Sequence, residues 1–145
     1  MDVHGSIDIE AAPERVWQFL VEPDKVLRWY KTLQEFRYTD ERRGPGAHVY
    51  VEERAVGPML KIDFEATEWI DDRLLAFHMT SGSGVKAYDQ RWSLDPAMTG
   101  CRFTFDEHVV LPFGPLGRLL GVVARRTSEA HVAEMLASLK GLAEA

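Results

Sequence analysis

Polar side chains interrupt the apolar alternation of two neighbouring stretches near the C-terminal end of the sequence. Gln90 alternates with Tyr88 and Trp92 in the first stretch, and Glu107 alternates with Phe105 in the second. Because alternate residues of a strand share a face, both polar groups would enter an apolar cavity if these faces point inward. A carboxyl group in such a cavity has a raised pKa or acquires a partner, and either suits general acid/base chemistry. Glu107 is therefore the candidate acid/base residue, and Tyr88 or Gln90 could orient a ligand carbonyl.

Two further acids follow the same alternation in earlier stretches. Glu53 follows Val51, and Glu68 follows Ala66, so both are predicted on inward faces. The alternative is that these acids lie exposed at strand ends or pair with a neighbouring arginine, for which the candidates are Arg54, Arg91 and Arg102. The sequence leaves both interpretations open, because a shift of one residue in register moves a side chain to the other face.

Aromatic residues are frequent in the same strands and could line a pocket for a flat or apolar ligand. Most of them must form ordinary core, because Trp and Phe dominate burial in a sheet of this kind. We expect two or three to reach a pocket. The full set of predicted ligand-contacting residues is Phe64, Phe77, Tyr88, Gln90, Trp92, Phe103, Phe105 and Glu107.

The sequence gives little support for a metal site, a phosphate-binding loop or a catalytic nucleophile. The five histidines are scattered, with no pair at metal-binding spacing, and Cys101 alone cannot build a thiolate site. Residues 82–84 (GSG) lack the Gly-Lys-Ser/Thr of a phosphate loop and read as a hairpin turn. On the last predicted helix, His131 and Glu134 lie one turn apart and could face the cavity mouth or solvent; solvent is expected, because a helix of this length must carry a polar side. We predict no metal and no other cofactor.

The elements that must position these residues follow from the periodicity. Alternating stretches predict seven strands, near residues 3–9, 36–38, 47–55, 60–70, 74–81, 85–94 and 100–111. Two short helices are expected after the first strand, opening at residues 12–14 and covering residues 25–30. The turn between the third and fourth strands is placed at Val56, Gly57 and Pro58. Consecutive hairpins predict an antiparallel sheet that curls as its twist accumulates, and the class is α+β.

Residues 112–145 are predicted to form one long helix after this sheet. Prolines and glycines mark its start, and no proline follows within it. Its apolar residues change sides near residues 125–128, which predicts a bend there or two halves that cover different surfaces. A helix of this length cannot bury itself, so the concave side of the sheet is expected to receive it.

Length and charge limit the remaining possibilities. The chain of 145 residues is expected to be one domain, residues 1–145. A net charge of −6 disfavours nucleic acid or an anionic membrane as partner. No apolar run approaches the ~18 residues of a membrane span, and no signal peptide is evident, so we expect a cytoplasmic protein without stable membrane insertion. Monomer and homodimer both remain open.

Four motifs spread along the chain resemble one family. They are residues 7–17 (IDIEAAPERVW), residues 68–77 (EWIDDRLLAF), the pair WSLDP at 92–96 and GCRFT at 100–104, and residues 112–117 (PFGPLG). Together with the element order they resemble the START-like, or SRPBCC, superfamily and its polyketide cyclase/dehydrase-like members. The resemblance implies a helix-grip fold, in which a curved seven-stranded sheet wraps a long C-terminal helix. It leaves function open, because the superfamily includes aromatase/cyclases, lipid and hormone binders and co-chaperones.

Three functional hypotheses follow. The first is a binder of a hydrophobic small molecule, lipid-, aromatic- or polyketide-like, held between the sheet and the helix. The second is a polyketide cyclase, dehydratase or aromatase in which Glu107 acts as acid/base. The third is a protein-interaction module similar to the co-chaperone members, which predicts a filled core and an exposed apolar patch.

Overall fold

The computed structural model describes residues 1–55 and 57–145, so the first residue of the predicted turn at Val56 lies outside the described residues. The elements are β1 (Asp2–Ile9), α1 (Pro13–Val21), α2 (Pro23–Trp29), β2 (Leu33–Tyr38), β3 (His48–Glu53), β4 (Leu60–Ile70), β5 (Leu74–Gly82), β6 (Ala87–Ala97), β7 (Gly100–Val110) and α3 (Gly114–Glu144). The order matches the prediction, and the strand boundaries differ from it by a few residues.

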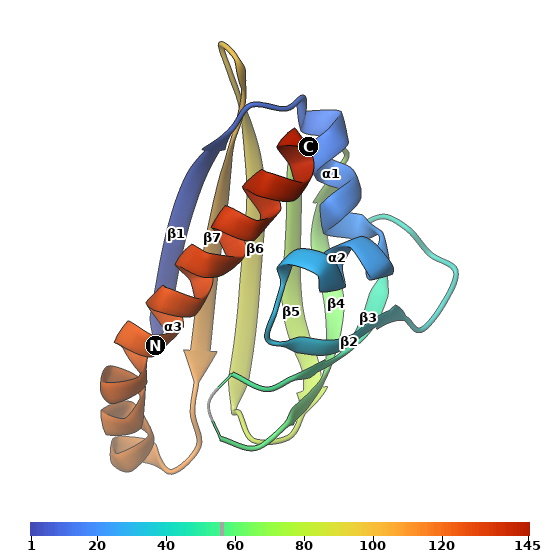
Figure 1. Ribbon diagram of the computed structural model, residues 1–145. Coiled ribbons are helices and arrows are strands. Elements are labelled where there is room, and N and C mark those ends of the chain that lie inside the picture. The colour runs from blue at the N-terminus through green and yellow to red at the C-terminus, as the bar shows by residue number, and fades with distance from the viewer. Residues whose placement is uncertain (56) are drawn as a thin grey trace.

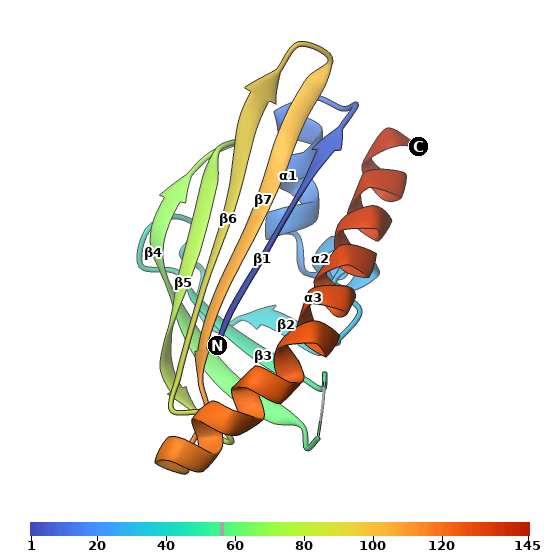
Figure 2. The same ribbon diagram turned by 90° about the vertical axis from the view of Figure 1, so that its left-hand side faces the viewer.

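All seven strands belong to one antiparallel sheet. Its spatial order is β1-β7-β6-β5-β4-β3-β2, so every neighbouring pair except β1 and β7 is also consecutive in sequence. The sheet curls into a half-barrel around the long C-terminal helix (Figure 1; Figure 2). The predicted α+β helix-grip architecture is therefore confirmed.

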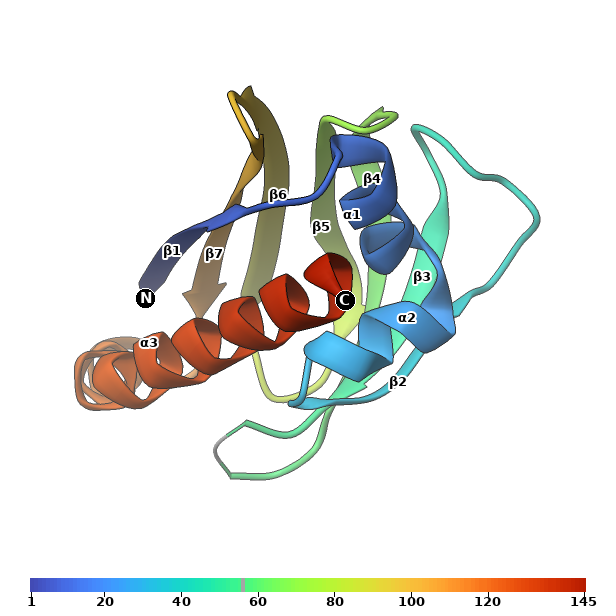
Figure 3. The same ribbon diagram turned by 45° about the horizontal axis from the view of Figure 1, so that its top comes forward.

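The two short helices begin at proline, whose fixed φ and missing N–H suit a first helical turn. Glu22 lies between them in an extended conformation and separates them. Figure 3 shows α1 and α2 next to the C-terminal part of α3, on the same side of the sheet. The second helix starts at Pro23, two residues before the predicted start.

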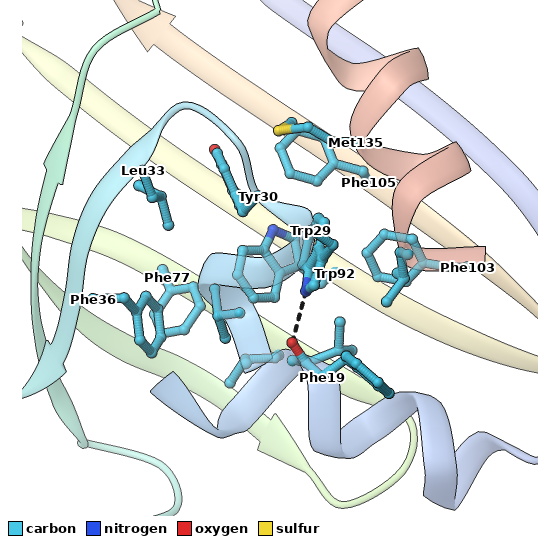
Figure 4. Packing of buried hydrophobic residues seen from close by; sticks show 14 of the residues in the cluster. Phe19, Trp29, Tyr30, Leu33, Phe36, Phe77, Trp92, Phe103, Phe105 and Met135 are labelled. Carbon is cyan, nitrogen blue, oxygen red and sulfur yellow. Dashed lines mark hydrogen bonds between the residues drawn. The ribbon is translucent and has the colours of Figure 1, made fainter. Parts of the chain in front are cut away.

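A cluster of aromatic rings joins α2 to the inner face of the sheet (Figure 4). Trp29 is fully buried and packs edge-on against Trp92 and Phe103, with ring centroids 5.4 and 5.8 Å apart. Its indole N–H donates to the carbonyl of Phe19 in α1 at 2.7 Å. A buried indole with a satisfied N–H fixes both helices against the sheet.

The two halves of α3 differ in direction and burial, and of the two predicted alternatives the bend is the one observed (Figure 2). The C-terminal half buries Val132, Met135, Leu136 and Leu139 and packs on β1. There Gly5 permits close approach, because an added Cβ would lie 2.8 Å from Val132 and 2.9 Å from Leu136. The first turns run at an angle to the rest (Figure 2) and leave apolar side chains exposed, namely Leu116, Leu119, Leu120, Val122 and Val123.

None of the helices in the described part of the chain is both long and apolar enough to cross a membrane.

Candidate functional site

An open cavity of about 570 Å³ lies between the sheet and α3. Its wall is formed by the residue before β1, the connection from α2 to β2, strands β3, β4, β6 and β7, and several turns of α3. Most of the lining is apolar, with contributions from Leu60, Val85, Val109, Leu111 and Val123. The volume falls in the range of small-molecule sites, about 300–1,000 Å³.

Glu107 lies in this wall, at the inner face of β7. The side chain is half-buried, and its burial together with the charge of nearby Glu53 raises the pKa of Glu107 to about 8. The hydroxyl of Tyr88 and the amino group of Met1 partly oppose this rise. At neutral pH the carboxyl group of Glu107 is therefore mainly protonated and can donate a hydrogen bond.

Glu53 lies in the same wall and is held by hydroxyl groups instead of cations. Its side chain is buried, and its two oxygens accept hydrogen bonds from Tyr88 at 2.7 Å and from Thr32 at 2.8 Å. Thr32 comes from the α2–β2 connection and Tyr88 from β6, so the carboxyl group joins three parts of the chain. The inward prediction for Glu53 is correct, and its partners are not arginines.

Gln90 organises the tyrosines behind this carboxyl pair. Its amide nitrogen donates to the hydroxyl of Tyr30 at 2.6 Å and to that of Tyr88 at 3.0 Å. Its amide oxygen accepts from the indole of Trp92 at 3.0 Å. Because an amide has two N–H donors, both are used within the protein. Gln90 therefore positions the two hydroxyl groups, and this network leaves it no N–H for a ligand.

Burial and the charges of Glu53 and Glu107 raise the pKa values of Tyr30 and Tyr88 well above their ordinary value. Both tyrosines therefore remain neutral and keep their hydroxyl protons. The site thus combines two carboxyl groups with neutral hydroxyl groups in a partly desolvated setting, which is suited to holding or moving a single proton.

The predicted ligand-contacting residues separate into three groups. Tyr88 and Glu107 line the cavity between the sheet and α3, and Tyr88 also borders the small void described next. Phe64, Phe77, Gln90 and Trp92 surround a void of about 20 Å³, room for about one water molecule. Phe103 and Phe105 are fully buried in the aromatic cluster and are not among the residues that line either space.

The inward prediction for Glu68 is wrong. A β-bulge between Ala66 and Glu68 shifts the register of β4 against β5, and this moves the carboxyl group to the outer face. There Glu68 is exposed and forms an ion pair with Arg91, the arrangement that the alternative interpretation anticipated.

His131 was expected to face solvent, and this prediction is also wrong. The imidazole lines the cavity, and its Nδ1 is buried without a hydrogen-bond partner among the described residues. A signal was present in the sequence: Thr127, His131 and Met135 are spaced at four residues, so they share one side of α3. All three line the cavity.

Within the described residues, no group of three or more His, Cys, Asp or Glu side chains is placed to hold a metal ion. The polar groups of the cavity are therefore considered as ligand contacts in their own right.

Comparisons with known proteins agree with this architecture. Residues 1–144 match a family model described as polyketide cyclase/dehydrase and lipid transport. The protein TTHA0849 from Thermus thermophilus has a similar structure, with 21% identity, a TM-score of 0.83 and coverage of 99% of this chain and 97% of that chain. A search of curated protein sequences found no match.

Two further solved structures carry descriptive names. The Zhui aromatase/cyclase from Streptomyces sp. R1128 is 14% identical, with a TM-score of 0.77 and coverage of 99% of this chain and 93% of that chain. A START superfamily protein from Mycobacterium smegmatis is 15% identical, with a TM-score of 0.74 and coverage of 99% and 97%. At these identities the similarity shows the fold alone.

Proposed function

Because the chain belongs to the polyketide cyclase/dehydrase and lipid-transport family, we propose that it binds a hydrophobic small molecule between the curved sheet and α3. The ligand is lipid-, aromatic- or polyketide-like. The observation that carries this proposal is the cavity of about 570 Å³, with a mainly apolar wall and a few polar groups at one place in it. That combination is typical of small-molecule sites, in which apolar surface provides affinity and a few polar groups fix orientation.

The exposed apolar residues of α3 are consistent with this function. Phe113, Leu120 and Val123 are exposed, and each also lines the cavity. Part of the apolar surface therefore belongs to the wall of an open site. The protein-interaction alternative predicts a filled core instead, and the cavity disfavours it.

A matched pair of substitutions on α3 tests the binding function. Ala124 lines the cavity, whereas Ala130 is exposed on the same helix and does not line it. We expect Ala124→Trp to fill the cavity and to weaken binding of the neutral fluorophore Nile red at least ~10-fold. Ala130→Trp should bind it like the unmodified protein. Equal binding by both variants, or no binding by the unmodified protein, would contradict the proposal.

A second function, a polyketide cyclase, dehydratase or aromatase activity, is favoured by the state of Glu107. A protonated carboxyl group can donate its proton to a ligand carbonyl, and once ionised it can accept a proton from the adjacent carbon. Burial and Glu53 give Glu107 a pKa of about 8, close to the pH of such chemistry. The O–H of Tyr88 already donates to Glu53, so Tyr88 would hold the carboxyl pair in place and not the ligand carbonyl. The test is turnover of a linear β-polyketone: Glu107→Gln should retain affinity and lose turnover, and an unmodified protein without turnover excludes this function.

A further inference from the structure

The charges that line the cavity restrict the kind of ligand it can hold. We propose that the ligand carries a basic amine on an apolar body, and that the site discriminates against carboxylates and phosphates. This inference rests on the proposed binding function and adds a head-group class to it. It follows from the acceptor groups in the wall and from the absence of Lys and Arg side chains among the described residues that line it.

No Lys or Arg side chain occurs among the described residues that line the cavity. The amino group of Met1 lies in the wall, and it donates to the carbonyl of Val109 at 2.7 Å. Arg125 lies on the same stretch of α3 and pairs with Glu129 at 2.9 Å; it does not line this cavity, but it lines a second open space of about 760 Å³ that Glu107 also borders. An anionic head group would lose its hydration, find no Lys or Arg side chain in the described wall to pair with, and be repelled by the nearby charge of Glu53.

An ammonium head group fits the free acceptors of the wall. It carries three N–H donors, which need acceptors once water is removed. The carboxyl group of Glu107 lines the cavity, and so does the imidazole of His131, whose Nδ1 has no partner among the described residues and would accept a ligand N–H in the tautomer that carries its proton on Nε2. Both oxygens of Glu53 already accept hydrogen bonds, from Tyr88 and Thr32. Each Glu53 oxygen keeps a further lone pair, but Glu53 is already the more engaged of the two acids, so we assign the pairing with the cation to Glu107, and Glu53 adds a nearby negative charge.

Binding of an amine should change the number of protons held at the site. In the empty site Glu107 holds a proton at neutral pH, because burial and Glu53 raise its pKa. An amine arrives from water as an ammonium ion, and Glu107 becomes a carboxylate, so its proton passes to the buffer. The other titratable or charged groups that line the cavity around it are the Met1 amino group before β1, Tyr30 after α2, Glu53 on β3, Tyr88 on β6 and His131 on α3. Both tyrosines stay neutral throughout.

Three probes with one tail and different head groups test the inference: octylamine, octanol and octanoate. Binding to the full chain is measured by calorimetry at about pH 7, in two buffers with different ionisation enthalpies. We expect octylamine to bind at least ~10-fold tighter than octanol, because a desolvated charge pair contributes more than a neutral hydrogen bond. Octanoate should bind at least ~10-fold more weakly than octanol. The difference between the buffers should show release of about one proton with octylamine and none with octanol.

Glu107→Gln keeps the size of the side chain and removes its ionisation. In this variant octylamine should bind no tighter than octanol and should release no proton, while octanol binding stays within about 3-fold. The matched control is Glu134→Gln, an exposed acid one turn from His131, which should leave all three affinities unchanged. A thermal melt of each variant confirms that it is folded.

The outcomes separate this inference from the function on which it rests. If octanoate binds as tightly as octylamine, or if the amine preference survives in Glu107→Gln, the head-group inference is wrong and the apolar site remains. If octanol and octylamine bind equally without proton release, the site recognises neutral polar groups, which also overturns the inference. If none of the three probes binds while Ala124→Trp and Ala130→Trp bind Nile red equally, the proposed binding function itself fails.

Discussion

Asp106 and Glu107 are consecutive residues of β7, and they point to opposite faces of the sheet. On the outer face, Asp106 lies opposite His4 of β1 and contacts its imidazole at 2.5 Å. On the inner face, Glu107 lies opposite Gln90 of β6, in the wall of the cavity. The two acids are chemically similar, and the environment on each face gives them different states.

A regular row of acids and histidines crosses the outer face of the sheet. One row of directly opposed residues crosses six strands and alternates acid with histidine, in the order Asp2, His108, Asp89, His78, Glu65, His48. Side-chain contacts between an acid and a base occur along it, as for His78 and Asp89 at 2.5 Å. Alternating partners of this kind stabilise a sheet weakly at each pair.

On the inner face, the described hydrogen bonds of Glu53 come from hydroxyl groups and not from histidine or arginine. The carboxyl groups of this face are surrounded by Tyr, Thr and Gln, and burial raises the pKa of Glu107 where the outer network lowers the pKa of Asp2. The sheet therefore separates its acids by face: acids with basic partners lie on the outer surface, and Glu53 and Glu107 face the cavity.

Removing the ionisable group of Glu107 should have the largest effect on the stability of the protein. The folded protein holds the Glu107 proton more tightly than the unfolded chain, so the stabilisation is complete below the ordinary pKa and is lost as pH rises through about 8. Since one pKa unit corresponds to about 1.4 kcal/mol, the free energy of unfolding should fall by a few kcal/mol between about pH 5 and pH 9. Glu107→Gln should remove most of this slope. Urea denaturation at several pH values measures it.

The neighbouring residue supplies the control for that experiment. Asp106→Asn makes the same chemical change one residue earlier, on the exposed face, where an ion pair contributes about 0–1 kcal/mol. Its effect at pH 9 should be small. If the free energy of unfolding depends on pH in the same way in both variants, the two faces of the sheet do not differ as described.

A smaller effect on stability is expected from removing the hydroxyl group of Tyr88, which is a partner of Glu53 in place of a cation. Tyr88→Phe deletes the donor to Glu53 and one acceptor for Gln90. Leaving buried polar groups unpaired costs about 1–3 kcal/mol, measured as a loss in the free energy of unfolding at neutral pH. Tyr50→Phe is the control: its hydroxyl donates to Glu52 at 3.0 Å on the partly exposed side of β3. Equal losses for the two substitutions would mean that burial of the inner network adds nothing.

Alternation in the sequence predicted which face each of these acids occupies wherever the strands are regular. Glu53, Gln90 and Glu107 follow apolar residues at a spacing of two and do lie on the inner face. Glu68 also follows apolar residues at a spacing of two, but it lies on the outer face of the sheet. The β-bulge after Ala66 shifts the alternation of inward and outward side chains. Nothing in the local alternation distinguishes that strand from a regular one, so only the pairing with β5 reveals the shift.

Depth within the inner face could not be predicted in this way. Phe105 and Glu107 share a face of β7, yet the ring of Phe105 packs on Tyr30, with centroids 5.9 Å apart, while Glu107 borders open space. The difference depends on where α2 and α3 lie over the sheet, which is a long-range property of packing. For the same reason His131 was missed: the helix pattern defines a side, and the cavity beneath that side is formed by other elements.

Removing the charge of Asp2, on the outer face, should have the smallest effect on stability. The hydrogen bond from His108 is the first cause that lowers the pKa of Asp2, so its stabilisation is present above the ordinary pKa and is lost as pH falls. Asp2→Asn should therefore lower the melting temperature slightly at neutral pH and low salt. The difference should disappear near pH 2, and it should shrink in about 1 M salt because exposed charges are screened. A difference that persists in acid and in salt would show that Asp2 acts through packing, and the outer acids would then no longer form one electrostatic class.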